Sequence, residues 1–169
     1  LGGALIKNKL FFFVNGEITD KSYPTSYNVG EGSNVTKEEA DQVMNHLKSI
    51  SGGYNGGGYG PMDVTTKSYK ILERIDWNIN DNNKFTLRHS YVSGKQLKFP
   101  LSAHGLRFNV NGYYMNSKTH TFAAELNTKL NNTMNNELRV GYTRVRDNRD
   151  FGSTPFPYVK VKLDNLRYI

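Results

Sequence analysis

The chain has 169 residues, and 22 Lys and Arg against 15 Asp and Glu give a formal net charge of +7. This length suits one ordinary domain. A hydrophobic content of 37% and a mean hydropathy of −0.63 exclude a protein built from membrane-spanning helices, which need about 20 apolar residues each. The first residue is Leu1 rather than Met, and no signal-peptide pattern follows it, so we expect a piece of a longer protein.

The composition also limits the chemistry of the chain. It contains no cysteine, which excludes disulfides, a Cys-ligated zinc site and a thiol nucleophile. A pI near 9.5 raises the question of nucleic-acid binding, but no two Lys or Arg residues are adjacent. Because the positive charge is spread along the chain, we expect a basic, solvated surface and no nucleic-acid partner.

The first predicted strand begins at Leu10. Apolar side chains recur at every second position, which is the period of a strand with two unlike faces. One face holds Leu10, Phe12, Val14 and Ile18, and the other turns polar after Phe11 and Phe13, with Asn15, Glu17, Thr19 and Lys21.

A long loop is predicted near 22–66, and it contains one short helix. Thr36 and Glu39 have the spacing of a capping box, and Val43, Met44 and Leu47 then form an apolar stripe before two glycines. The Gly/Tyr run at 54–61 follows a helix and precedes no Lys, so it predicts a flexible surface loop rather than a phosphate site.

The next two predicted strands form a hairpin around a turn at 81–83, which consists of Asp and Asn. The first strand is apolar at Tyr69, Ile71, Ile75, Trp77 and Ile79 and polar at Lys70, Arg74, Asp76, Asn78 and Asn80, with Leu72 and Glu73 as exceptions. In the second strand, Phe85, Leu87, His89 and Tyr91 oppose Thr86, Arg88 and Ser90.

A second long loop near 95–118 leads to a second predicted hairpin, with its turn at 131–135. Its strands are apolar at Phe122, Ala124, Leu126, Leu130, Leu138, Val140 and Tyr142, and polar at the intervening positions. The result is five strands of roughly 10 to 13 residues, longer than the usual 5 or 6.

These patterns predict an all-β fold of antiparallel up-and-down strands, with short turns at one end and long loops at the other. Long strands with one apolar and one polar face are typical of a transmembrane β-barrel segment, here with long extracellular loops and one short loop helix. A soluble sheet packed on a core alternates in the same way. Glu73 favours the soluble sheet, because the alternation of side chains places this carboxylate on the face that would contact lipid. A β-bulge that shifts the alternation by one residue would move it to the other face.

Several stretches resemble the TonB-dependent receptors of bacterial outer membranes, in particular the Oar-like group with a carboxypeptidase-regulatory-like extension. Residues 2–13, GGALIKNKLFFF, resemble the passage from the plug domain into the first barrel strand, with Ala4 in place of the usual Pro. Similar stretches lie at 70–88, 125–142, 156–157 and 166–169. The resemblance implies a plug exit segment at 1–9 and a partial barrel at 10–169, about five of the roughly 22 strands that close around a plug.

The resemblance further implies active uptake of a bulky ligand across the bacterial outer membrane. The implied partners are outer-membrane lipid, the plug domain of the same parent chain, the TonB complex through regions absent here, and a surface lipoprotein. For ligand contact we single out Tyr54, Tyr59, Tyr113 and Tyr114, because loop aromatics offer stacking area at low entropic cost. Packing within the loops or anchoring at the membrane interface is the alternative role for these four side chains.

The sequence also bears on two other function classes. A soluble β-sandwich that binds carbohydrate or protein stays open as the alternative function. An enzyme is not expected, because His46, His89, His104 and His120 lack metal-ligand spacing and no GxSxG, HExxH or P-loop motif occurs. We therefore expect no catalytic residue, no metal and no cofactor.

Overall fold

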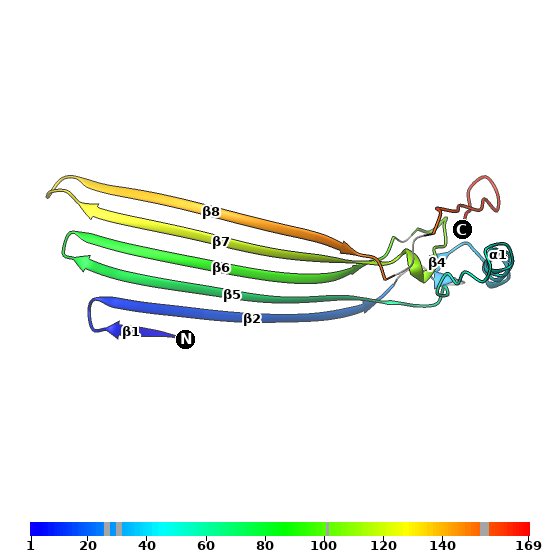
Figure 1. The fold of residues 1–169 in the computed structure, drawn as a ribbon, viewed down its shortest axis with the longest axis horizontal. Coiled ribbons are helices and arrows are strands. Elements are labelled where there is room, and N and C mark those ends of the chain that lie inside the picture. Colours follow the sequence, from blue (N-terminus) through cyan, green and yellow to red (C-terminus); the bar gives the residue numbers. More distant parts are fainter. Residues whose placement is uncertain (26–27, 30–31, 101, 153–155) are drawn as a thin grey trace. The chain divides into compact units, whose positions relative to one another are not determined.

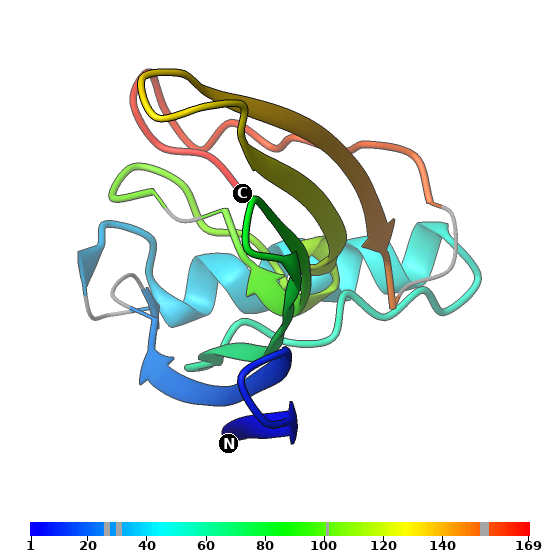
Figure 2. The ribbon, with the colours of Figure 1, turned by 90° about the vertical axis from the view of Figure 1, so that its left-hand side faces the viewer.

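The computed structural model describes residues 1–25, 28–29, 32–100, 102–152 and 156–169. Six strands form one sheet in the order β1-β2-β5-β6-β7-β8, so the predicted all-β, antiparallel up-and-down fold is confirmed (Figure 1). The sheet is open, and Figure 2 shows β1, in blue, and β8, in yellow-brown, on opposite sides of it. The six strands are β1 (Gly2–Ile6), β2 (Leu10–Pro24), β5 (Asp63–Asn80), β6 (Asn83–Lys98), β7 (Tyr113–Lys129) and β8 (Asn135–Asp150).

The five long strands are longer than the sequence predicts. They contain 15, 18, 16, 17 and 16 residues, compared with the expected 10 to 13. Each continues beyond its apolar section into polar residues; β8, for example, runs on from Tyr142 to Asp150. Backbone pairing does not require apolar side chains, so the end of the alternating pattern does not mark the end of a strand.

The two predicted tight turns are confirmed, and both lie at the same end of the sheet (Figure 1). Asn80 Oδ1 accepts hydrogen bonds from the backbone N–H groups of Asn82 and Asn83 at 3.0 and 2.9 Å. Asn131 Oδ1 accepts in the same way from Thr133 and Met134, both at 2.9 Å. Asparagine side chains thus reverse the chain in both hairpins.

Strand β1 was not predicted. It pairs antiparallel with the start of β2, so that Gly2 lies opposite Phe13 and Ile6 lies opposite Leu10. Asn8 turns the chain between them with a φ of 59°. A Cβ atom on Gly2 would lie 3.0 Å from the Phe12 carbonyl oxygen, so this pairing uses the close approach that glycine permits. Two consecutive glycines give no side-chain alternation, which is why the strand escaped detection.

The chain divides into two compact units. The sheet unit comprises residues 1–20, 67–95 and 116–148, and the loop unit comprises 21–66, 96–115 and 149–169. The loop unit therefore contains most of both predicted long loops together with the C-terminal segment. It holds α1 (Lys37–Ile50), the 3₁₀ helix η1 (Asn109–Asn111), and a two-stranded parallel pair of β3 (Asn28–Val29) and β4 (Gly32–Ser33).

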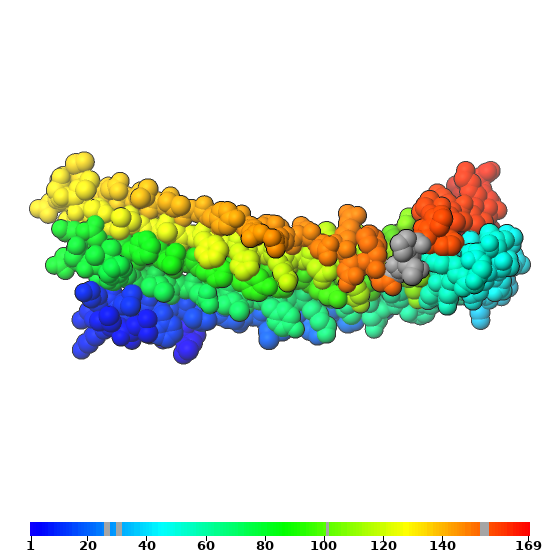
Figure 3. Space-filling view, viewed as in Figure 1, coloured from blue at the N-terminus to red at the C-terminus, as the bar shows by residue number. Residues whose placement is uncertain are grey.

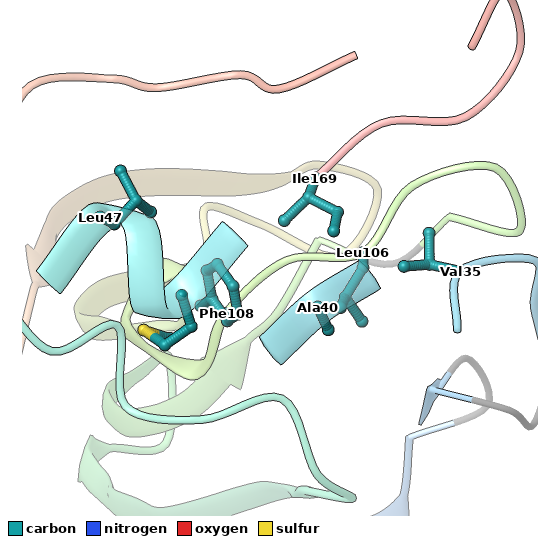
Figure 4. Close-up of a cluster of buried hydrophobic side chains, with 7 residues drawn as sticks. Val35, Ala40, Leu47, Leu106, Phe108 and Ile169 are labelled. Atoms are coloured by element: carbon teal, nitrogen blue, oxygen red, sulfur yellow. The ribbon is translucent and has the colours of Figure 1, made fainter. Parts of the chain in front are cut away.

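Helix α1 begins with the predicted capping box. Thr36 Oγ1 accepts from the backbone N–H of Glu39 at 3.2 Å, and Glu39 Oε2 accepts from the N–H of Thr36 at 2.9 Å. The apolar side of the helix packs into the core of the loop unit (Figure 4). Within the described ranges, no helix has the length and apolar character needed to cross a membrane. The buried core consists of Val35, Ala40, Met44, Leu47, Leu106, Phe108 and Ile169.

The Gly/Tyr run at 54–61 forms no helix or strand, in keeping with the predicted surface loop, and one of its glycines is buried. Gly56 is buried, and its carbonyl oxygen accepts a hydrogen bond from the Val110 N–H at 3.2 Å. A Cβ atom on Gly56 would lie 2.7 Å from Met44 and 3.1 Å from Phe108. At Gly56 the backbone thus lies directly against core side chains, a close approach that glycine permits.

Candidate functional site

One face of the sheet unit carries hydrogen-bonded charges. Asp76 Oδ1 receives a hydrogen bond from Arg74 Nη2 at 2.7 Å on its own strand and from Thr86 Oγ1 at 2.8 Å on β6. Between β2 and β5, Lys70 Nζ lies 2.7 Å from Glu17 Oε1. Further along the sheet, Arg139 is paired with Glu125 and Glu137. These contacts join neighbouring strands through polar groups and suit a face in contact with water.

The opposite face is apolar, and the residues that the structure describes leave its side chains exposed. Eight of its large side chains, named at the end of this paragraph, are 39 to 62% exposed, although exposed apolar side chains in a soluble protein are normally scattered rather than contiguous. The space-filling view shows the strands lying side by side on the face of the sheet that is turned to the reader (Figure 3). The exposed residues are Ile71, Ile75, Trp77, Leu87, Phe122, Leu138, Val140 and Tyr142.

Glu73 lies on this apolar face and is hydrogen-bonded there. Its Oε2 is 2.9 Å from His89 Nδ1, and His89 Nε2 is 3.1 Å from His120 Nδ1. The His89 ring also stacks on Phe122 with a centroid distance of 4.4 Å. The Glu73 carboxylate therefore has a hydrogen-bond partner on the apolar face, and no β-bulge is needed to move it to the other face.

The sequence offered a signal for the pair that Glu73 forms with His89. Both residues are eight positions from Asp81 in the predicted turn (81 − 73 = 8 and 89 − 81 = 8), which places them on neighbouring strands at the same level. His120 comes from another hairpin, so nothing local linked it to this pair. No group of three or more His, Asp or Glu among the described residues is arranged to hold a metal ion.

The loop unit contains a cavity of about 260 Å³ that is lined largely by aromatic side chains, here called the aromatic groove. The Tyr54 and Phe156 rings are stacked on its wall, with centroids 3.6 Å apart and an angle of 14° between their planes. The aromatic groove is lined by Leu47, Tyr54, Phe108, Val110, Asn111, Phe151, Phe156, Pro157, Tyr158 and Val159.

A smaller cavity of about 50 Å³ adjoins the aromatic groove and has basic residues in its wall; we call it the cationic cavity. Arg107 and Lys160 line it, and the Lys160 Nζ lies 3.9 Å from the centroid of the Tyr168 ring. A hydrogen bond from Ser102 and the positive charges of Lys160 and Arg107 lower the pKa of Tyr168. The two cavities share Leu47, Phe108, Asn111, Tyr158 and Val159.

The four tyrosines singled out from the sequence do not form one site. Tyr54 lines the aromatic groove. The Tyr59 hydroxyl donates to Asp41 Oδ1 at 2.5 Å, which raises the pKa of Tyr59, and its ring lies 6.2 Å from that of Phe108. Tyr113 and Tyr114 are neighbours at the start of β7, where successive side chains point to opposite faces.

Four aromatic residues of the aromatic groove were not singled out as binding residues: Phe108 and three residues of the C-terminal segment. Phe151, Phe156 and Tyr158 belong to the C-terminal segment, which shows no helical or strand period that would orient its side chains. The available signal was composition alone: aromatic residues are concentrated at 151–158. Such a concentration does not say which element the rings pack against.

The C-terminal segment forms an ion pair with α1 through Arg167. Arg167 Nη1 lies 3.0 Å from Glu39 Oε2 and 2.9 Å from the Asn34 carbonyl oxygen, and Arg167 Nε lies 2.6 Å from Asp164 Oδ2. Arg167 and the backbone N–H groups of residues 166 and 167 lower the pKa of Asp164 from 3.8 to about 2. The pKa of Glu39 is lowered as well, first by the Thr36 N–H.

Acidification is expected to destabilise the loop unit. Because the pKa of Asp164 is lower in the folded state, its stabilising effect is complete above the unfolded pKa of about 4 and is lost as the pH falls toward 2. Asp164→Asn should flatten the pH dependence of the urea midpoint between pH 5 and 2, whereas Asp150→Asn, the same charge change on β8, should leave it as in the wild type. Equal pH profiles for Asp164→Asn and the wild type would contradict this account.

No protein-family model, curated protein or solved structure matches the chain.

Proposed function

We propose that the chain is part of a TonB-dependent receptor that actively takes up a bulky ligand across the bacterial outer membrane. In this proposal the sheet unit belongs to the transmembrane β-barrel, and the loop unit is extracellular. The observation that carries the proposal is a sheet of long strands with an uncovered apolar face opposite a face of hydrogen-bonded charges.

The strand lengths suit this role. A strand of 15 residues, the shortest of the five long ones, extends for about 50 Å at about 3.3 Å per residue. At a tilt of about 45° it spans the hydrocarbon core of about 30 Å and still projects on one side. Lipid would cover the apolar face, and the water-filled or plugged interior would accept the charges of the opposite face.

The connections at the two ends of the strands indicate how the sheet would be oriented in the outer membrane. Outer-membrane barrels have short turns on the periplasmic side and longer loops outside the cell. The tight turns at 81–83 and 131–135 would thus be periplasmic, and the connections after β2 and β6 extracellular. Residues 1–9 would lead in from the plug domain, the TonB complex would be reached through other parts of the receptor, and a surface lipoprotein would lie over the extracellular face.

The soluble sandwich has less support. A sandwich requires a second sheet against the apolar face. In the part of the chain that the structure describes, the only other sheet is the two-stranded β3–β4 pair. Glu73, which favoured the sandwich, is hydrogen-bonded to His89 at 2.9 Å.

Single cysteines on neighbouring residues test the proposal, because the chain has no cysteine of its own. Leu87 and Arg88 are adjacent in β6 and point to opposite faces. In the full-length protein in vesicles, a fluorophore on Leu87→Cys should be quenched strongly by brominated lipid, and one on Arg88→Cys should be quenched only weakly. Equal quenching at the two positions would refute the membrane assignment.

A further inference from the structure

We propose that the aromatic groove and the cationic cavity together bind the C-terminal end of a peptide. The peptide's α-carboxylate would lie at Arg107 and Lys160, and its last large apolar side chains would lie in the aromatic groove. This inference names a ligand class for the loop unit and so rests on the proposed uptake function.

The aromatic groove has the surface that large apolar side chains require. The stacked rings of Tyr54 and Phe156 form a fixed wall, and Phe108 forms a buried floor. Phe151 and Tyr158 line the same cavity although they are 57 and 76% exposed. Rings that are held in place and still accessible bind a planar or aromatic partner at a small entropic cost.

Arg107 and Lys160 in the cationic cavity favour a ligand with an anionic group. No carboxylate of the described residues lies within 4.0 Å of Arg107 or Lys160, and neither cavity has an Asp or Glu in its lining. Both cations line the same cavity as Tyr168, and the Lys160 Nζ lies 3.9 Å from the centroid of its ring. A carboxylate at this point would gain charge-assisted hydrogen bonds without displacing an existing ion pair.

The junction of the two cavities favours a peptide over other apolar acids. Asn111 lines both cavities, and its Nδ2 donates to the Phe108 carbonyl oxygen at 3.1 Å, which holds the side-chain amide in place. A peptide has a backbone amide next to its terminal carboxylate that can pair with this group. A fatty acid would use the cations and the apolar surface but leave the Asn111 amide without a ligand partner.

The binding test uses the full-length protein in detergent and two fluorescein-labelled tripeptides that end in two phenylalanines. One peptide has a free C-terminal carboxylate, and the other has a C-terminal amide. Fluorescence anisotropy should show the acid binding at least about tenfold more tightly than the amide, which is the effect of losing a charge-assisted hydrogen bond. Arg107→Gln and Lys160→Gln should each weaken binding of the acid about tenfold and leave binding of the amide unchanged.

Matched variants distinguish the site from a general charge effect. Lys162→Gln makes the same charge change in the same segment but outside both cavities, and it should bind like the wild type. Lys160→Arg should retain binding of the acid, and Tyr158→Ala should weaken both peptides. The urea midpoint of each variant shows whether it is folded.

Two results would overturn the inference: equal affinity for the acid and the amide, or displacement of the peptide by laurate at the same concentration as by unlabelled peptide. Either result leaves the quenching pattern of the Leu87 and Arg88 labels unchanged. Conversely, failure of that pattern would remove the membrane function without altering peptide binding in detergent.

Discussion

Ile71→Lys is expected to lower the free energy of unfolding of the membrane-inserted protein by about 2–4 kcal/mol, the cost of a lysine near the middle of a bilayer. Ile71 lies within β5, and its side chain is on the uncovered apolar face, 41% exposed. In lipid this face has no water to solvate an ammonium group, and the carboxylate two residues along the same face, Glu73, is already hydrogen-bonded to His89. Urea unfolding in vesicles, followed by electrophoretic mobility without boiling, measures the change.

Ser90→Lys is the matched control for this prediction. Ser90 lies in β6 between His89 and Tyr91, so its side chain points to the charged face. A lysine there would face water and should change the free energy of unfolding by less than about 0.5 kcal/mol, as is usual for surface positions. If both variants were equally destabilised, or neither, the assignment of the apolar face to lipid would be wrong.

Phe108→Ala is expected to destabilise the loop unit by about 3–5 kcal/mol, the usual cost of removing a buried aromatic ring. Phe108 is 7% exposed and belongs to the buried core (Figure 4). Its removal would also open the floor of the aromatic groove. Limited proteolysis in increasing urea should show cleavage within 21–66 at a lower denaturant concentration than in the wild type, while the sheet unit stays resistant.

Ile50→Ala controls for the loss of an apolar side chain in the same unit. Ile50 is the last residue of α1 and is 67% exposed, so its truncation should leave the proteolysis profile within error of the wild type. A loop unit that resists protease equally in the wild type and Phe108→Ala would show that this core does not hold the connections together.

The sheet could be predicted because its side chains alternate. Leu87 and Arg88 are assigned to different faces by position alone, and the Asn-rich turns mark the hairpins without reference to any distant residue. Strand β1 was missed because Gly2 and Gly3 contribute no alternation. The strand ends were misjudged for a related reason, since ladder hydrogen bonds continue where the apolar pattern stops.

The candidate site was less predictable because it depends on contacts between distant segments. Tyr54 and Phe156 stack across 102 positions of sequence (156 − 54 = 102), and Arg107 lines the same cavity as Lys160. No local period couples such residues. Tyr59 shows the opposite case: an aromatic residue in a Gly-rich run suggested ligand contact, whereas its hydroxyl is hydrogen-bonded to Asp41.

The pairing of β1 with β2 bears on how the proposed barrel would close. β1 occupies the outer edge of β2 over residues 10–13 and leaves that edge free from residue 15 onward. A final barrel strand would need the same edge, so β1 and that strand compete for the same backbone groups. Closure would therefore displace Gly2–Ile6 from the sheet and release residues 1–9 as a tether. The backbone groups of β2 that pair with β1 in the open sheet would then pair with the last strand.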